Sequence, residues 1–358
     1  MHLTLVVPGP LDLPASVLGA ADARASAFSR LLAAAGSPTI IDHDGLLASS
    51  CRLLGIAKQS DWPIAPWLAR AAGFDPEDAY WLCAAPATLI VGQDDVRLSG
   101  LVDDLALEDA EALLAVLNAH FADDAVRFFA PTARQWFVRV LNAQRLETRP
   151  PEVALGAPLF AFMPAGADAA RWRRWQNEMQ MLLFEHPANR EREQAGRAPV
   201  NSVWLWGGGT VNRERGAPAA SIFADDVRMR DLARGRGVEV APTPANFDAL
   251  PLSGTAAVWL MPIDHGDAIE RLGGIDRTWM APVERALNAG RLSEVELIVG
   301  GRERALHFAV RRSSLARRWR ARLSPPRLSF RAEAIFAREA LARAVLAAAI
   351  LATALPHR

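Results

Sequence analysis

The sequence predicts a soluble α/β protein built around a mostly parallel sheet. Apolar runs at 2–7, 256–261 and 295–299 are typical of buried strands, and amphipathic helical segments lie between such runs. Alternation of strands and helices favours a parallel sheet covered by helices on both faces. With 358 residues, the chain is long enough for about two domains, or for one large α/β domain with an inserted subdomain.

Composition and charge narrow the functional classes. The chain is 51% hydrophobic and 22% charged, as expected for a folded soluble protein, and its formal net charge of +0 argues against a general nucleic-acid binder. Only Cys51 and Cys83 are present, without the spacing of a metal site, so we expect free thiols. The first ten residues lack a basic leader and a cleavage site, and we expect a cytoplasmic protein.

The first part of the chain is predicted to form a strand, a loop and helices, followed by a small α+β unit. The strand at 2–7 ends at Pro8-Gly9-Pro10, and a helix is expected over 25–35. Ser60 precedes a helix, so it is either a nucleophile or, with the larger weight, a helix cap. Strands at 87–91, 96–98, 126–129 and 135–141 surround a helix at 108–121, and the Gly/Pro-rich stretch that follows places a boundary near Ala165.

The stretch 172–209 combines a helix, a turn and a strand that ends in glycines. Trp172, Trp175 and Met179 give the helix a buried stripe, and Pro187 is expected to end it. Polar side chains gather at the turn, and glycine amides in the following strand can approach a ligand closely. The candidate binding residues are His186, Asn189, Arg192, Asn201, Gly207, Gly208 and Gly209. Structural capping of the turn is an equally weighted interpretation of the polar side chains.

The strand–helix alternation continues to about residue 300. Strands are expected at 221–224, 237–240, 256–261 and 295–299, with helices at 225–234 and 276–289. Ligands of such sheets bind beyond the carboxyl ends of the strands. We therefore expect Pro8, Gly207 and Asp264 to lie together at that edge.

The last 48 residues are rich first in arginine and then in alanine. Arg311, Arg312, Arg317, Arg318, Arg320 and Arg322 form a cluster that we interpret as a solvated helix face, in preference to a phosphate or nucleic-acid patch. The apolar segment 341–355 is too short to span a membrane. We expect it to pack on the body of the protein or to mediate self-association.

A resemblance to a known family rests mainly on the central stretch. The residues that carry it are His186-Pro-Ala-Asn189, Arg192, Gly196, Pro199-Val-Asn201 and Gly207-Gly208-Gly209. This pattern resembles archaeal-type cofactor-independent phosphoglycerate mutases. It is closer still to a bacterial branch labelled phosphoglycerate mutase or RpfE-type regulatory protein, with counterparts of Gln176-Asn177-Glu178, Ala84-Ala85-Pro86 and Arg134-Gln135-Trp136-Phe137.

The resemblance implies a fold and a mechanism. The fold is the alkaline phosphatase-like three-layer α/β sheet, here a discontinuous domain of residues 1–79 and 166–310 with an inserted α+β subdomain at 80–165 and a helical extension at 311–358. The mechanism uses a phosphoserine and two divalent metals, manganese or zinc, which neutralise the phosphate and activate the serine. Ser60 is the position that matches the nucleophile, because Gly73-Phe74-Asp75-Pro76 follows it much as in the family.

The sequence departs from the family pattern at three metal-binding loops. Pro8-Gly9 stands where a metal-binding aspartate is expected, and Gly300-Gly301-Arg302 replaces an Asp-His pair. Asp264 and His265 follow the right strand but lack the family spacing, so they are weak metal candidates. We therefore expect no metal cofactor, a relic serine, and a noncatalytic or repurposed protein that binds a small phosphorylated or acidic ligand or a protein partner. The alternative is an active mutase or phosphatase with two metals.

Overall fold

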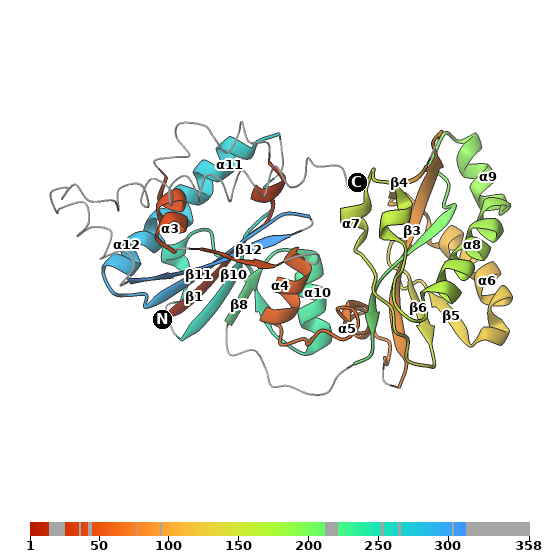
Figure 1. The fold of residues 1–358 in the computed structure, drawn as a ribbon, viewed down its shortest axis with the longest axis horizontal. Coiled ribbons are helices and arrows are strands. Elements are labelled where there is room, and N and C mark those ends of the chain that lie inside the picture. The colour runs from red at the N-terminus through yellow and green to blue at the C-terminus, as the bar shows by residue number, and fades with distance from the viewer. Residues whose placement is uncertain are drawn as a thin grey trace, which may run out of the picture. The chain divides into compact units, whose positions relative to one another are not determined.

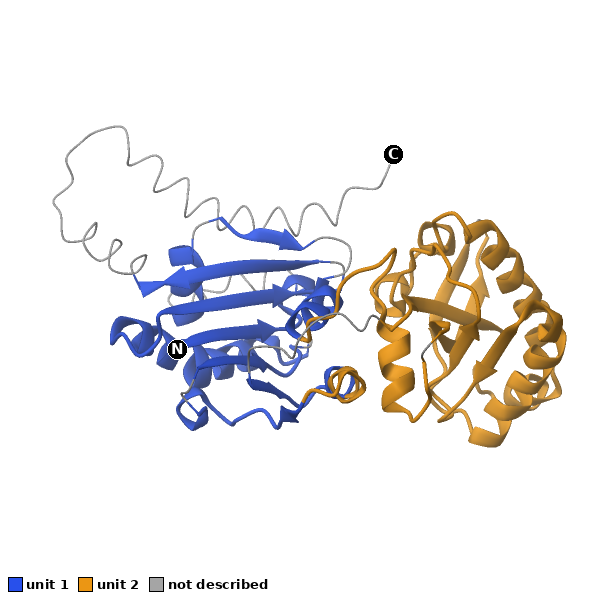
Figure 2. Ribbon diagram, turned by 90° about the horizontal axis from the view of Figure 1, so that it is seen from below, with its two compact units in different colours: residues 1–53, 218–230, 239–358 blue, residues 54–217, 231–238 orange. Residues whose placement is uncertain are grey.

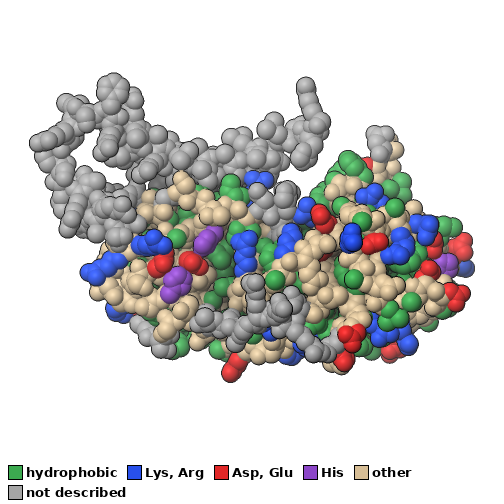
Figure 3. Space-filling view, turned by 60° about the horizontal axis from the view of Figure 1, so that its bottom comes forward, with side chains coloured by type: hydrophobic (Ala, Val, Ile, Leu, Met, Phe, Trp, Pro, Cys, Tyr) green, Lys and Arg blue, Asp and Glu red, His purple; other side chains and the backbone are tan. Residues whose placement is uncertain are grey.

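The computed structural model describes residues 1–13, 26–35, 37–41, 45–76, 78–93, 95–211, 221–251, 254–263, 266–302 and 304–312. The chain forms two compact units (Figures 1 and 2). Unit 1 comprises residues 1–53, 218–230 and 239–358, and unit 2 comprises residues 54–217 and 231–238. On the face seen in Figure 3, basic and acidic side chains are interspersed, in keeping with the net charge of +0.

Unit 1 contains a seven-stranded sheet of the described residues, in the order β2-β12-β11-β1-β10-β8-β9. The five strands from β11 to β9 are parallel, whereas β12 and β2 join one edge as antiparallel strands. The strands are β1 (His2–Val7), β2 (Thr39–Ile41), β8 (Ser221–Ala224), β9 (Val240–Ala241), β10 (Thr255–Trp259), β11 (Glu294–Gly300) and β12 (Ala305–Arg311). The predicted α/β class with a largely parallel sheet is confirmed.

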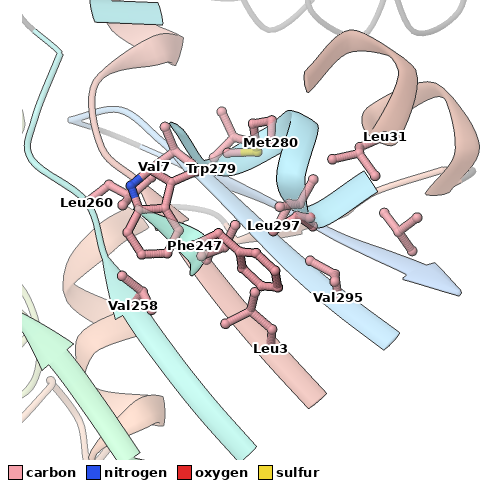
Figure 4. Packing of buried hydrophobic residues seen from close by; sticks show 14 of the residues in the cluster. Leu3, Val7, Leu31, Phe247, Val258, Leu260, Trp279, Met280, Val295 and Leu297 are labelled. Carbon is pink, nitrogen blue, oxygen red and sulfur yellow. The ribbon is translucent and has the colours of Figure 1, made fainter. Parts of the chain in front are cut away.

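Helices cover both faces of this sheet. Every second residue of β1, β10 and β11 points to the same face of the sheet. These residues pack with Leu31, Phe247, Trp279 and Met280 into one core (Figure 4). This face is covered by α3 (Ala27–Ala35), α11 (Ala268–Ile275), a π-helical turn (Asp276–Met280) and α12 (Ala281–Asn288). Helix α4 (Gly45–Leu53) packs on the opposite face, where a Cβ atom on Gly300 would meet the Leu46 side chain.

Unit 2 is a two-layer α+β structure. Its sheet has the order β4-β3-β6-β5, and β7 also pairs with β3. All of these pairs are antiparallel. The strands are β3 (Tyr80–Val91), β4 (Val96–Leu101), β5 (Val126–Phe129), β6 (Phe137–Val140) and β7 (Ser202–Gly209). The helices are α5 (Ile64–Ala71), α6 (Leu107–His120), α7 (Pro151–Ala154), α8 (Ala169–Phe184) and α9 (Pro187–Gln194), while α10 (Val227–Arg236) has residues in both units.

Unit 2 is larger than the 80–165 segment expected to be inserted. Helix α8 buries Trp172, Trp175 and Met179 against one face of the sheet, and β7 pairs with β3. Both elements follow residue 165, so the domain boundaries of the structure differ from the expected ones. The sequence analysis predicted that β7 belongs to the parallel sheet, which is wrong. The pairing of β7 with β3 joins segments far apart in the sequence, and such a pairing leaves no local sequence pattern. Gly207 therefore does not join Pro8 at the edge of that sheet.

Two further elements differ from expectation. Residues 305–311 form strand β12, in which Arg311 Nε binds Glu294 Oε1 at 2.8 Å, so Arg311 is not on a helix face. The rest of the arginine cluster from Arg317 onward and the segment 341–355 lie outside the described residues. Within the described part of the chain, no helix combines the length and apolar character needed to cross a bilayer.

Candidate functional site

The edge of unit 1 at which the family resemblance implies a metal centre lies at the carboxyl ends of the parallel strands. Strands β1, β10 and β11 are parallel neighbours, so the loops that follow them emerge at one edge. These loops carry Pro8 and Gly9 after β1, Ile263 after β10, and Gly301 and Arg302 after β11. Among the residues that the structure describes, this edge therefore has the position, but not the side chains, of a carboxylate-rich metal site.

The main chains of the three loops contact one another directly. The Gly9 N–H donates to the Gly300 carbonyl at 2.9 Å, and the Ile263 N–H donates to the Pro8 carbonyl at 3.1 Å. Gly9 has a φ of 97°, and a Cβ atom at this position would lie 2.4 Å from the Ile263 carbonyl oxygen. Backbone groups thus occupy the space beside β1, and this loop has no room for a metal-binding side chain at Gly9.

Three described carboxylates near this edge accept hydrogen bonds from neighbouring main-chain groups. Asp12 accepts the Arg302 N–H at 3.0 and 3.1 Å through its two oxygens. Asp225 accepts from Thr243 at 3.3 Å, and Asp226 accepts from Met229 at 2.8 Å in the first turn of α10. The weak metal candidates Asp264 and His265 lie outside the described residues.

The described residues do not fit a two-metal centre. They contain no group of three or more His, Cys, Asp or Glu side chains that could hold a metal ion. A dinuclear site requires several such donors around both ions.

Ser60 lies in unit 2, beside a small polar pocket of about 80 Å³. The pocket is lined by Gln59, Ser60, Asp61, Tyr80, Ala143, Gln144, Gly208 and Thr210. Ser60 is exposed, and α5 begins at Ile64 with Pro63 as its N-cap and no side-chain capping bond. The interpretation of Ser60 as a helix cap is therefore wrong, and its hydroxyl lies at a pocket that holds about two or three waters by volume.

A buried network beside the pocket joins three segments of unit 2. Asp61 Oδ1 accepts the Trp62 N–H at 2.8 Å, and Oδ2 accepts the Thr148 N–H at 3.0 Å and the Thr148 hydroxyl. The Thr148 hydroxyl oxygen in turn accepts the Gly207 N–H at 2.9 Å. Asp61 thus fixes the loop before α5 to β7 and positions Ser60, its neighbour in sequence.

Tyr80 contributes a buried hydroxyl to the pocket. Its side chain is 3% exposed, and its Oη atom has no hydrogen-bond partner in the described structure. Burial, reinforced by the negative charges of Asp61 and Asp168, raises the pKa of Tyr80 far above its ordinary value of 10.0. The phenol stays protonated at neutral pH, so it can donate or accept a hydrogen bond but cannot act as a base.

We expect Tyr80→Phe to raise the free energy of unfolding by about 1 kcal/mol, because the substitution removes a buried hydroxyl that makes no hydrogen bond. Urea denaturation checks this value. Tyr80→Leu is the control, since it removes the hydroxyl together with the ring and should destabilise the protein. A loss of stability in Tyr80→Phe would show that the hydroxyl is hydrogen-bonded in solution.

The glycines at the end of β7 allow close packing. A Cβ atom would lie 2.9 Å from Ile64 Cβ at Gly207, 2.2 Å from Tyr80 Oη at Gly208, and 2.4 Å from Pro63 Cβ at Gly209. Gly207 also has a φ of 68°, at an irregularity in the β3–β7 pairing. The structure therefore uses this glycine run to bring β7 against α5 and Tyr80.

Asn189 and Asn201 bind main-chain groups. Asn189 is 2% exposed and donates to the Leu183 and Val200 carbonyls at 2.7 and 2.8 Å, while its Oδ1 accepts the Val200 N–H at 2.8 Å. Asn201 accepts the Leu89 N–H at 2.7 Å and donates to the Leu89 carbonyl at 2.9 Å. The second pair continues the β3–β7 pairing beyond Ser202.

Arg192 and His186 are also engaged within the protein. Arg192 is 1% exposed, and its guanidinium donates to the Ala198 carbonyl at 2.8 Å and to the Asp104 carboxylate. The pKa of Asp104 is lowered by that hydrogen bond. His186 caps α9 by accepting the Ala188 N–H at 3.2 Å, and burial lowers its pKa. The polar residues expected in a turn lie mainly in α9, which begins at Pro187 because proline is well suited to a first helical position.

Sequence reasoning missed Tyr80, Thr148 and Gln144 as neighbours of Ser60. None of them belongs to a motif, and 84 residues separate Ser60 from Gln144. Tyr80 is the chain's single tyrosine, but nothing in the sequence shows which way its side chain points. The tertiary structure assembles this pocket.

Comparisons with known proteins identify relatives of the chain by sequence. No family model matches it. A 2,3-bisphosphoglycerate-independent phosphoglycerate mutase of Methanothrix thermoacetophila is 31% identical over 247 residues, which are 63% of this chain and 56% of the relative. The corresponding protein of Methanosarcina acetivorans is 26% identical over 197 residues, 48% of this chain and 49% of the relative.

A solved structure was also matched, that of a cofactor-independent phosphoglycerate mutase from Thermoplasma acidophilum, with a TM-score of 0.42, 17% identity, and coverage of 86% of this chain and 89% of that chain. The chain spans about half the length of the curated relatives that it matches. The resemblance to cofactor-independent phosphoglycerate mutases is confirmed, whereas the closer likeness to the RpfE-type branch stays a prediction. The chain is similar in sequence, over about half to two thirds of its length, to archaeal proteins named as 2,3-bisphosphoglycerate-independent phosphoglycerate mutases.

Proposed function

We propose that this protein is a noncatalytic or repurposed phosphoglycerate mutase-like protein, a pseudoenzyme that acts in the cytoplasm as a binding or regulatory protein. The observation that carries the proposal is the edge of the unit 1 sheet. There Pro8 and Gly9 replace a metal-binding aspartate, and the Gly9 main chain bonds directly to Gly300 at 2.9 Å. We assign the protein to the bacterial RpfE-type branch, which the central stretch resembles.

The alternative is an active metal-dependent mutase or phosphatase. Ser60 favours it, because this serine is exposed at a polar pocket and lies at the position that matches the family nucleophile. In that case Asp264 and His265 would be metal ligands, with manganese or zinc as the metals. The alternative therefore requires both a bound metal and a reactive Ser60.

A combined metal and activity measurement tests the proposal. We expect protein incubated with manganese or zinc and then desalted to retain far less than two ions per chain, and to show no turnover of 3-phosphoglycerate. The physical reason is that the described edge supplies too few donors to hold two ions. Metal content is measured by mass spectrometry, and turnover by a coupled assay.

Ser60→Ala provides the matched control. If the wild-type protein holds two metals and turns over 3-phosphoglycerate while Ser60→Ala does not, the noncatalytic proposal fails and the alternative stands. Equal trace rates in both proteins would identify a contaminating mutase. A protein partner, including self-association through 341–355, is then sought by sizing the full chain and a chain ending at residue 312.

A further inference from the structure

One face of the unit 2 sheet carries two arginines in adjacent strands. The register pairs Trp81 of β3 with Arg139 of β6, and Arg139 with Arg127 of β5. Side chains opposite each other in antiparallel strands lie on the same face. The three side chains therefore form a row across the sheet, on the face opposite to that covered by α6 and α8 (Figure 1).

A single aromatic ring holds both guanidinium groups. The Cζ atoms of Arg127 and Arg139 lie 5.7 and 5.6 Å from the centre of the Phe129 ring. The Phe129 ring itself stacks on Trp81 at 5.5 Å and contacts Phe74 at 5.1 Å. Since Trp81 is 1% exposed, the ring rests on a rigid base, and cation–π attraction positions the two arginines in advance of any ligand.

The two positive charges have no acidic partner in the described structure. No ion pair joins Arg127 or Arg139 to a carboxylate of the described residues. Two exposed arginines of this unit do have one, since Arg97 lies 2.8 Å from Asp95 and Arg174 lies 3.7 Å from Glu178. Like charges directly opposite in a sheet repel, typically at a cost of a few tenths of a kcal/mol. A bound anion would remove this repulsion.

A simple packing role explains this arrangement less well. An arginine stem often covers an aromatic ring, and one arginine over Phe129 would suffice for that purpose. A second arginine, placed directly opposite the first, adds repulsion without a compensating carboxylate. The pair is therefore better explained by recognition of an anion than by shielding of the ring.

We propose that Arg127 and Arg139 form a binding site for the phosphate group of a small phosphorylated molecule. Guanidinium groups are planar, stay charged at all physiological pH values and bind phosphate oxygens in pairs. A phosphate monoester carries a charge of about −1.5 to −2 near neutral pH, which matches two arginines. The partly exposed Phe129 ring offers an apolar contact to the carbon portion of the ester.

The site gives the binding function proposed above a ligand class, but it does not depend on the loss of metal chemistry. If the protein holds metals and turns over 3-phosphoglycerate while the arginine pair binds phosphate, only the proposed function fails. If phosphate does not bind at the pair, only this inference fails. The two proposals therefore have separate tests.

The test is a titration of the full chain at constant ionic strength. Calorimetry measures binding, and thermal unfolding measures the change in Tm. Inorganic phosphate and phenyl phosphate are the two probes, and sodium chloride is the reference salt. We expect saturable binding of phosphate and a rise in Tm that chloride does not produce. Tighter binding of phenyl phosphate would identify an ester as the ligand, and equal binding would identify free phosphate.

Arg127→Gln and Arg139→Gln should each weaken binding by about tenfold or more, because each removes one charge-assisted contact. Arg174→Gln, which loses the same charge elsewhere in unit 2, should bind as the wild type does. Without ligand, Arg127→Gln and Arg139→Gln should have a Tm equal to or above that of the wild type, since they relieve repulsion. The proposal is overturned if the wild type binds no phosphate, if both variants bind it normally, or if Arg174→Gln weakens binding equally.

Discussion

Asp61→Ala is expected to lower the free energy of unfolding by about 4 kcal/mol. The substitution leaves the Trp62 N–H, the Thr148 N–H and the Thr148 hydroxyl without their buried acceptor. Each buried group left unsatisfied costs about 1–3 kcal/mol, and part of this cost is recovered when the loop relaxes. Urea denaturation followed by tryptophan fluorescence measures the change.

Thr148 provides the controls for this prediction. Thr148→Val keeps the shape of the side chain but removes the hydroxyl, so the Gly207 N–H loses its acceptor, and we expect a loss of about 2 kcal/mol. Thr148→Ser keeps the hydroxyl and should cost less than about 1 kcal/mol. If Asp61→Ala were no more harmful than Thr148→Ser, the network would not hold the loop before α5 against β7.

Asn189→Ala is expected to cost about 3 kcal/mol. The side chain joins the end of α8 to Val200, two residues before β7, through bonds of 2.7, 2.8 and 2.8 Å to Leu183 and Val200. Its removal leaves buried main-chain groups unsatisfied and creates a small cavity. The measurement is again the free energy of unfolding in urea.

Asn189→Asp separates scaffold from binding site. The two side chains have nearly the same shape, but the carboxylate would present an oxygen to the Leu183 and Val200 carbonyls in place of the amide hydrogens. We expect a stability loss at least as large as that of Asn189→Ala, with phosphate binding at Arg127 and Arg139 unchanged in the folded protein. Normal stability together with lost ligand binding would instead restore Asn189 as a binding residue.

The local elements of the fold were largely predictable. The strand at 2–7, the strand at 126–129 and the helix at 27–35 were found within about two residues, because each depends on hydrophobic periodicity within a short segment. The strand at 305–311 was not, because its alternation lies next to an arginine cluster that favoured a helix face. The helix expected at 276–289 is part of a longer helical segment that includes a π-helical turn.

The candidate site was less predictable, and the reason is geometric. Asn189, Arg192 and Asn201 were candidate binding residues, with structural capping as an equally weighted interpretation, because whether such side chains face a ligand or the main chain depends on neighbours distant in sequence. Arg192 binds Asp104, 88 residues away, and Asn201 binds Leu89, 112 residues away. When the partner of a polar side chain lies far away in the sequence, the sequence alone does not show whether that side chain binds a ligand or the main chain.

By itself, the sequence determined the α/β class, the largely parallel sheet and the relationship to phosphoglycerate mutases, since these depend on local periodicity and on a contiguous motif. It also showed that Pro8 and Gly9, neither of which is a carboxylate, follow the first strand, because the identity of a residue is visible without a structure. The tertiary structure alone decided that β7 pairs with β3 and that Arg127 faces Arg139. Strand register is a contact between distant segments, and its energy arises only when the chain has folded.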